Sequence, residues 1–339
     1  MKNTPIMLTV LESLNNALLQ VMEKDDRVYL LGEDILDPYG GAFKVTRGLS
    51  TRFPERVLST PISESAIVGI SNGLALAGLH PVVEIMFGDF VTLTADQIIN
   101  HAAKFRWMYN DQVRVPLVIR TPMGGRRGYG PTHSQSLEKL FLGVPGLRVV
   151  APNSLPDPGK LLETAISQEE RPILFVEHKL LYTCPVLEYG LGDLQDFEIV
   201  SSAGPFPTHT LKFSSAEKSK LTIATYGYNF ELARKAALEL AYEDEIFCEI
   251  VVFSQLNPFE MDPLFESIRR TRALLTVEEG TFTLGWGAEV VARAAEAIPS
   301  IKVRRAAALD LPIANSKSLE EKILPSQELI KELALDMVN

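Results

Sequence analysis

The chain has 339 residues, of which 46% are hydrophobic and 22% charged, and its formal net charge at pH 7 is −10. This composition is typical of a two-domain globular protein and argues against long disordered segments, and no apolar run approaches the roughly 20 residues that a membrane span needs. The negative charge makes nucleic acid a poor partner and mainly aids solubility, while two cysteines, Cys184 and Cys248, exclude a disulfide framework and suit a reducing cytoplasm.

The N-terminal half alternates helix-like and strand-like segments. Residues Met1 to Pro5 lead directly into a helical pattern, so we expect no signal peptide. Thr9 and Glu12 form a T-x-x-E capping box, which predicts the start of the first helix. In chain order the apolar patterns then predict strands at 28–31 and 57–58, a helix at 64–79, a strand at 81–86, a helix at 94–108, strands at 116–120 and 147–151, a helix at 157–167 and a strand at 172–177.

This alternation predicts an α/β fold with a parallel sheet that helices cover on both faces. Ligands of such sheets bind at the carboxyl ends of the strands. We therefore expect a site in the loops that follow Leu58, Met86 and Thr121.

A segment rich in Gly, Pro and Ser follows from Pro185 to about Lys220, and its regular patterning is lost. A second α/β unit then begins. We expect strands at 221–225, 246–253, 273–277 and 301–306 and helices at 229–242, 262–270 and 287–297. The sequence therefore predicts a first domain at residues 1–185, a linker at 186–219 and a smaller α/β domain at 220–339, with the boundary near residue 200.

Glu64 is the first candidate for chemistry, at the end of Thr60-Pro-Ile-Ser-Glu64. This segment follows a short strand and opens a helix. Acids favour the first turn of a helix because of its dipole, so the spacing alone favours a structural role over a functional one.

A glycine-rich loop, Met123 to Gln135, is the second candidate, and it ends in His133-Ser-Gln. Glycine allows the backbone to approach a ligand closely, and Arg126 and Arg127 could meet an anionic substrate. The alternative is a surface loop whose histidine only caps a helix.

Met86 and Phe90 form the third candidate, at the end of a predicted strand. Such residues are usually core, although an aromatic ring in a strand-exit loop can also stack on a heterocycle. The sequence contains no P-loop motif, no convincing dinucleotide motif after a strand, and no histidine pair at metal-ligand spacing.

Several short motifs occur together in one order, and their combination is more specific than any single one. The chain resembles the β subunits of the pyruvate, branched-chain 2-oxoacid and acetoin dehydrogenase complexes, which are transketolase-like proteins. The resemblance spans nearly the whole chain and rests on Leu31-Gly-Glu-Asp34, Tyr39 to Gly48, Thr60 to Glu64, Gly78 to Pro81, Asp96 to Asn100, Ala102 to Lys104, His133 to Gln135, Pro145 to Leu147 and Gly285 to Glu289.

The resemblance implies a pyrimidine-binding domain at 1–185, a transketolase C-terminal-like domain at 220–339, and thiamine diphosphate as the cofactor. In that family a separate α chain binds the diphosphate and Mg²⁺ through a G-D-G motif, and no Gly-Asp-Gly occurs here. The implied assembly is two α and two β chains that dock on a lipoyl acyltransferase core. The implied reaction is oxidative decarboxylation of a 2-oxoacid, with transfer of the acyl group to a lipoyl arm.

By matched motif, Glu64 would hydrogen-bond the aminopyrimidine ring nitrogen, so that the cofactor's own amino group can take the proton from the thiazolium carbon. A partly buried Glu has the raised proton affinity that suits this exchange. Met86 and Phe90 would line the aminopyrimidine pocket, and His133 would act in acyl transfer as a proton donor or orienting group. Glu33 and Glu84 match acids near the cofactor.

The family often holds a structural potassium ion on backbone carbonyls. The corresponding residues here are Leu117, Ala165, Ile166 and Gln168, next to a loop, 166–172, that departs from the usual pattern.

Two further segments depart from the family, Arg126 to Thr132 in the glycine-rich loop and Phe253 to Pro258 in the second domain. They leave open a related thiamine-diphosphate lyase or transferase with a non-lipoyl acceptor. A non-catalytic assembly subunit is the alternative from another class. The identity of the 2-oxoacid is not given by this chain, because much of that pocket would lie on the α chain.

Overall fold

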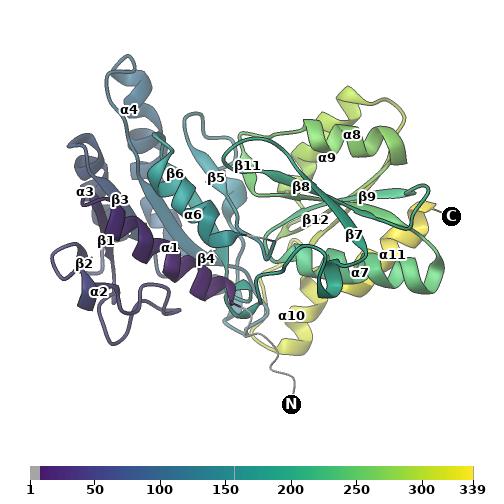
Figure 1. Ribbon diagram of the computed structural model, residues 1–339, viewed down its shortest axis with the longest axis horizontal. Coiled ribbons are helices and arrows are strands. Elements are labelled where there is room, and N and C mark those ends of the chain that lie inside the picture. Colours follow the sequence, from purple (N-terminus) through teal and green to yellow (C-terminus); the bar gives the residue numbers. More distant parts are fainter. Residues whose placement is uncertain (1–7, 156, 339) are drawn as a thin grey trace. The chain divides into compact units, whose positions relative to one another are not determined.

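The computed structural model describes residues 8–155 and 157–338, which form two compact units (Figure 1). The first unit comprises residues 1–122, 144–148 and 154–188, and the second comprises 123–143, 149–153 and 189–339. The expectation about a signal peptide concerns residues 1–7, which lie outside the described part of the chain.

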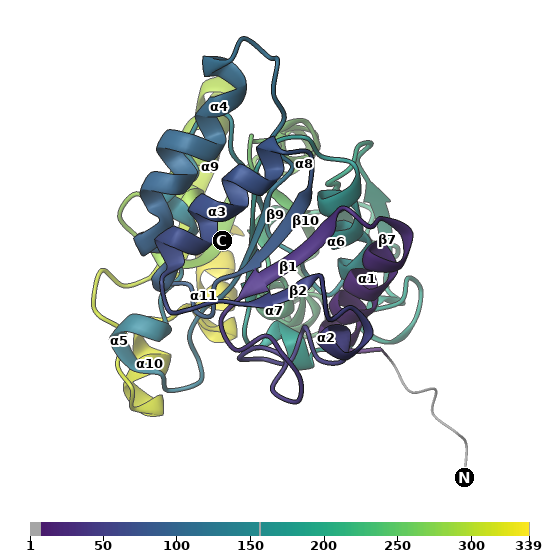
Figure 2. The same cartoon turned by 90° about the vertical axis from the view of Figure 1, so that its left-hand side faces the viewer.

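The first unit is built around parallel strands in the order β6-β4-β3-β1-β2. Figure 2 shows α1 and α6 on one face of this sheet and α3 and α4 on the other, which confirms the predicted α/β architecture. Its elements are α1 (Val10–Lys24), β1 (Val28–Gly32), α2 (Leu49–Arg52), β2 (Val57–Ser59), α3 (Glu64–Leu76), β3 (His80–Glu84), η1 (Phe90–Thr94), η2 (Gln97–Ala102), α4 (Ala103–Met108), β4 (Val118–Met123), α6 (Pro158–Ser167), β6 (Ile173–His178) and η4 (Leu181–Thr183).

Local sequence signals explain how these elements begin. The Thr9 hydroxyl accepts a hydrogen bond from the Glu12 N–H at 3.2 Å, and the Glu12 carboxylate accepts one from the Thr9 N–H at 2.8 Å, which confirms the capping box. The helix predicted at 94–108 is less regular than expected. Residues Gln97–Ala102 form a π-helical turn before α4 begins, a feature that apolar spacing does not reveal.

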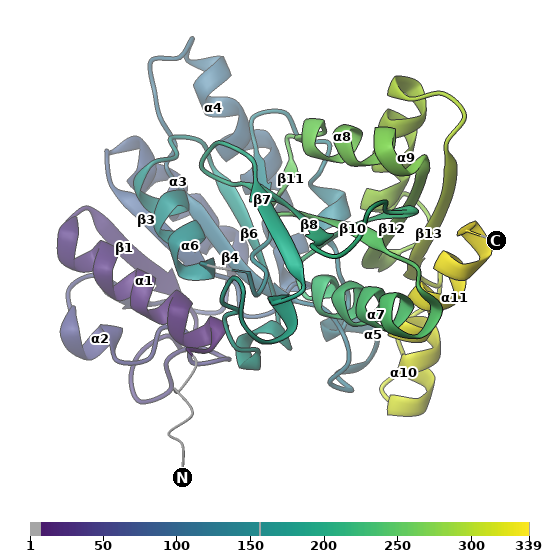
Figure 3. The ribbon, with the colours of Figure 1, turned by 45° about the vertical axis from the view of Figure 1, so that its right-hand side comes forward.

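The second unit is built around a six-stranded sheet in the order β13-β12-β9-β10-β8-β7. Figures 1 and 3 show α8 and α9 on one face of this sheet and α7 and α11 on the other. Its elements are α5 (Gly130–His133), η3 (Glu138–Leu140), η5 (Gly192–Leu194), β7 (Phe197–Ser201), β8 (Thr208–Phe213), β9 (Leu221–Tyr226), α7 (Asn229–Asp244), β10 (Cys248–Phe253), β11 (Gln255–Asn257), α8 (Asp262–Thr271), β12 (Ala273–Thr281), α9 (Trp286–Ala297), β13 (Lys302–Ala308), α10 (Lys317–Ile323) and α11 (Gln327–Val338); β5 (Arg148–Val150) pairs with β11 through Val149 and Val150.

The structure differs from the expectation of a linker at 186–219. That segment contains β7 and β8, and β8 pairs antiparallel with β10, so these residues complete the sheet of the second unit. Glycine, proline and serine concentrate at the turns around these strands and obscured them in the sequence. A second difference concerns residues 123–143, which follow β4 in the first sheet but cluster with the second unit.

The core of the second unit includes Trp286, which is fully buried at the start of α9. Its ring packs edge-on against Tyr226 at 5.1 Å and against Phe253 at 5.2 Å between ring centroids. This cluster fixes α9 on the strands beneath it. Across the described residues, no helix combines the length and apolarity that would let it cross a membrane.

Candidate active site

Neighbouring strands of the first unit end side by side at one edge of the sheet. Gly32 is in register with Ser59 on one side and with Glu84 on the other, and Glu84 is in register with Arg120. The segments that follow β1, β2 and β3 therefore start at the same level. This carboxyl edge is where open α/β sheets bind ligands.

Glu64 lies at this edge as the first residue of α3, and it is 7% exposed. The chain reaches it from β2 through Thr60, whose N–H donates to the Gly32 carbonyl at 3.0 Å. An acid that serves only the helix dipole is usually solvated. A buried carboxyl group at a strand edge has to be matched by another polar group, which favours a functional role.

Glu33 follows β1 directly and lies near Glu64. Burial raises the pKa of Glu33, the Glu64 and Asp34 carboxylates raise it further, and a hydrogen bond with the Ser63 backbone acts in the opposite direction. The Glu33 Oε1 atom is buried and has no hydrogen-bond partner among the described residues. The Thr60 hydroxyl is also buried and also has no hydrogen-bond partner among these residues. This edge therefore offers polar atoms that a bound ligand would satisfy.

Met86 and Phe90 follow β3 at the same edge, and both are half-buried rather than part of a closed core. Phe90 begins η1, and its ring contacts Phe87 edge-on at 6.3 Å between centroids. Phe87 in turn contacts Phe43 at 5.7 Å. Aromatic and thioether groups thus follow β3 at the same sheet edge as the acidic pair, and such groups suit a flat heterocycle.

A buried ionic network underneath this edge was not identified from the sequence. The Arg120 guanidinium is 1% exposed; it donates to Glu84 at 3.0 Å and forms a bidentate pair with Glu177 at 2.8 Å for both bonds. The Tyr182 hydroxyl also donates to Glu177. Burial raises the pKa of Glu84 although Arg120 opposes the shift. A charged residue inside an otherwise apolar parallel strand was the available signal.

Glu84 is therefore already paired with Arg120, and this ion pair links the ends of β3 and β4. The structure brings Glu33, Glu64 and Glu84 to one edge of the first sheet. Their roles toward a cofactor stay predictions.

His133 belongs to the second unit, at the end of the short helix α5, where it is half-buried. The sequence suggested Arg126 as a ligand of an anionic substrate, but in the structure its side chain binds other groups of the protein. Its Nε donates to Glu279 at 3.1 Å, and its Nη2 donates to the Pro325 carbonyl at 2.5 Å.

The four residues matched to a potassium site lie beside β4 and at the end of α6. The Leu117 carbonyl accepts a hydrogen bond from the Ile173 N–H at 2.8 Å. Ala165 lies in the last turn of α6, and Gln168 is its C-cap. Potassium binding here stays a prediction.

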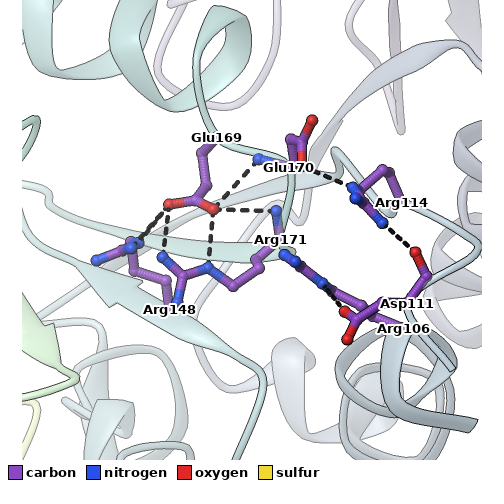
Figure 4. A network of polar contacts seen from close by, with 7 residues as sticks. All are labelled: Arg106, Asp111, Arg114, Arg148, Glu169, Glu170 and Arg171. Carbon is purple, nitrogen blue, oxygen red and sulfur yellow. Dashed lines mark hydrogen bonds and ion pairs between the residues drawn. The ribbon is translucent and has the colours of Figure 1, made fainter.

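The loop that follows α6 carries a network of ion pairs (Figure 4). Glu169 accepts hydrogen bonds from Arg148 at 2.8 Å and from Arg171 at 2.9 Å, and Glu170 accepts one from Arg114 at 2.6 Å. The guanidinium groups of Arg148 and Arg171 therefore both pair with Glu169, which follows Gln168 in the chain. Within the part of the chain that the structure describes, no cluster of three His, Cys, Asp or Glu side chains forms a metal site.

Comparisons with known proteins place this geometry in a family. Residues 7–185 match the transketolase pyrimidine-binding domain, and residues 213–330 match the transketolase C-terminal domain. A split-gene transketolase, an inactive β4 tetramer, has the same fold, with a TM-score of 0.72 at 19% identity over 98% of this chain and 100% of that one.

Curated relatives are more similar in sequence. The pyruvate dehydrogenase E1 component subunit beta of Rickettsia bellii is 35% identical over 324 residues, which cover 94% of this chain and 95% of the relative. The mitochondrial subunit beta-1 of Arabidopsis thaliana is 37% identical, over 95% of this chain and 86% of that protein, and the mitochondrial subunit beta of Saccharomyces cerevisiae is 32% identical, over 98% and 89%. On this evidence the chain belongs to the family of pyruvate dehydrogenase E1 β subunits, among the transketolase-like proteins.

Proposed function

We propose that this chain forms the aminopyrimidine half of a thiamine diphosphate site in a 2-oxoacid dehydrogenase. Membership of the family implies this cofactor and an α-subunit partner. The observation that carries the proposal is the buried acidic pair Glu33 and Glu64 at the carboxyl edge, with Glu33 Oε1 unpartnered among the described residues. When bound, thiamine diphosphate supplies the carbon nucleophile and the electron sink for decarboxylation.

In this proposal Glu64 holds a proton in a hydrogen bond to the pyrimidine ring nitrogen. Its burial keeps water from competing for this hydrogen bond. Glu33 receives a proton readily, because burial and the neighbouring carboxylates raise its pKa. Met86 and Phe90 orient the ring and exclude water from its edge. His133 assists transfer of the acyl group to a lipoyl arm.

We propose a pyruvate-like or branched-chain 2-oxoacid as the substrate and a lipoyl acyltransferase as the acceptor. The diphosphate and Mg²⁺ would be bound by the α chain in a complex of two α and two β subunits. We also propose a structural potassium ion on the backbone carbonyls of Leu117, Ala165, Ile166 and Gln168. The cytoplasm is the proposed location, although some relatives are named mitochondrial.

The outer face of α3 has features of a surface that binds a partner subunit. It exposes Ala66, Ile70, Gly73 and Ala77 in place of charged residues, and Ile70 is 60% exposed. Trp107 at the end of α4 is 85% exposed. Exposed apolar faces of this kind mark protein interfaces, and small residues let a second helix approach closely.

The test is a Glu64→Ala change in the co-expressed α/β enzyme with pyruvate and branched-chain 2-oxoacids as substrates. We expect decarboxylation to fall about 10²-fold or more while the assembly stays intact. Glu55→Ala is the control, because Glu55 is an exposed acid of the same unit. Unchanged turnover in the Glu64→Ala enzyme would indicate a non-catalytic assembly subunit.

A second assay compares turnover with and without a lipoyl domain. Reduction and acylation of the lipoyl group are expected. Acyl transfer to another acceptor without lipoyl reduction would identify a lyase or transferase instead. Calorimetry should also find that the β chain alone binds thiamine diphosphate weakly, because the diphosphate ligands would be missing.

A further inference from the structure

The loop that carries His133 is anchored by two buried carboxylates of the second unit. Glu279, in β12, is 3% exposed, and Glu320, in α10, is 2% exposed. The Gly125 N–H donates to Glu279 at 2.6 Å. The Arg126 N–H donates to one oxygen of Glu320 at 2.7 Å, and the Gly128 N–H donates to the other at 3.2 Å. Three backbone donors of one short segment are therefore held by two side chains.

The shape of the loop depends on these contacts. The Gly124 N–H donates to the Gln135 carbonyl at 3.1 Å, and this hydrogen bond joins the two ends of the loop. Arg126 adopts a φ of +68°, which a residue with a side chain rarely does, and its guanidinium also donates to Glu279. A Cβ atom at Gly125 would lie 2.6 Å from Leu324 Cδ1, so the backbone is pressed against the end of α10.

A loop with this composition would otherwise be mobile. Glycine loses more conformational freedom on ordering than any other residue, and residues 124, 125, 128 and 130 are all glycine. Hydrogen bonds from backbone N–H groups to a carboxylate are charge-assisted, and they are about twice as strong as bonds between neutral groups. The two carboxylates therefore order a backbone segment that its glycine-rich sequence would otherwise leave flexible.

We propose that Glu320 and Glu279 are positioning residues that hold the His133 loop in the conformation used for acyl transfer. The proposal rests on the role of His133 proposed above. Neither acid acts on substrate. The second unit, through β12 and α10, would in this way set the rate of the acyl-transfer half-reaction and leave decarboxylation to the first unit.

Hydrogen exchange of the chain carrying Glu320→Gln tests the clamp directly. An amide side chain keeps the size of Glu320 but places an NH₂ group opposite a backbone N–H. We expect amide exchange at Arg126 and Gly128 to rise about tenfold or more, together with faster tryptic cleavage after Arg126 and Arg127. Glu321→Gln is the matched control, because the Glu321 side chain is 59% exposed and pairs with Lys317. Unchanged exchange at 124–128 would reject the clamp.

Two half-reactions of the α/β holoenzyme test the consequence. Decarboxylation of pyruvate is followed with ferricyanide as the oxidant, and acyl transfer is followed on a free lipoyl domain. We expect Glu320→Gln to slow acyl transfer about tenfold while decarboxylation changes less than about twofold. Glu279→Gln should reproduce this split, which keeps the test valid if one variant folds poorly.

The double variant His133→Ala/Glu320→Gln separates positioning from a general structural effect. If Glu320 acts through His133, the double variant should be no slower in acyl transfer than His133→Ala alone. Additive losses, or parallel losses in both half-reactions, would overturn the positioning role. Normal acyl transfer in His133→Ala would instead reject the role proposed for His133, whatever hydrogen exchange shows for the clamp.

Discussion

The carboxyl groups of Glu33 and Glu64 oppose each other's charge at the carboxyl edge of the first sheet. Burial raises the pKa of Glu33, and the Glu64 carboxylate raises it further. The register of β1 with β2 brings this about, because Gly32 and Ser59 are paired and the next residues leave the sheet together. A like charge close by disfavours the ionised form of Glu33, in the same direction as its burial.

Glu33 should therefore cost stability at neutral pH. An acid whose pKa is raised on folding stabilises the fold below its unfolded value of 4.5, and this contribution is lost as the pH rises through the folded value. We expect Glu33→Gln to raise the melting temperature by about 1–3 °C at pH 8 and to have little effect near pH 4.5. Scanning fluorimetry from pH 4.5 to 8 measures this, and a constant difference across that range would contradict it.

Glu278 should give a second pH dependence, in the second unit. Burial is the main cause that raises the pKa of Glu278 to about 7, and the nearby Glu138 carboxylate acts in the same direction. A hydrogen bond from the Gly287 N–H at 2.8 Å and the charge of Arg305 act in the opposite direction. The wild type should lose about 3 kcal/mol of stability in total as the pH rises from about 4 to well above 7, of which about 1–1.5 kcal/mol falls between pH 6 and 8. Glu278→Gln should flatten this dependence in urea unfolding curves. Equal slopes for the two proteins would show that Glu278 is already ionised at pH 6.

Arg120 should be critical for the stability of the first unit. Arg120→Met would leave Glu84 and Glu177 buried without their cation, at a cost of about 3–5 kcal/mol. Arg114→Met, which breaks the exposed pair with Glu170, should cost less than about 1 kcal/mol. Urea denaturation compares the two variants. Equal losses would mean that the buried network contributes no more than a surface ion pair.

Trp107 should contribute to association with the α partner. Its ring is 85% exposed at the end of α4, and exposed tryptophans often dominate interface energetics. We expect Trp107→Ala to weaken α/β association about tenfold or more in analytical ultracentrifugation. Tyr242→Ala, at an aromatic residue that is 68% exposed in the second unit, is the control. Unchanged affinity of the Trp107→Ala chain would place the interface elsewhere.

Local signals in the sequence determined most of the regular elements. The capping box at Thr9 and Glu12 and the apolar runs of the parallel strands predicted α1, β1, β3, β4 and β6, because these features depend on neighbouring residues. Matched motifs singled out Glu64, Glu33 and His133, although spacing alone gave Glu64 a structural interpretation. Strands β7 and β8 were missed, because β7 is an exposed edge strand and its turns are rich in glycine and proline.

Tertiary structure alone decided which side chains act together. The pairing of Arg120 with Glu84 and Glu177 joins three strands, and the anchoring of Gly125, Arg126 and Gly128 joins a loop to acids about 150 and 190 residues further along the chain. Local spacing records the period of a helix or strand, but it holds no information on strand register or on contacts between distant segments. For that reason the sequence pointed to the candidate acids, and the packed sheets determined their burial and their partners.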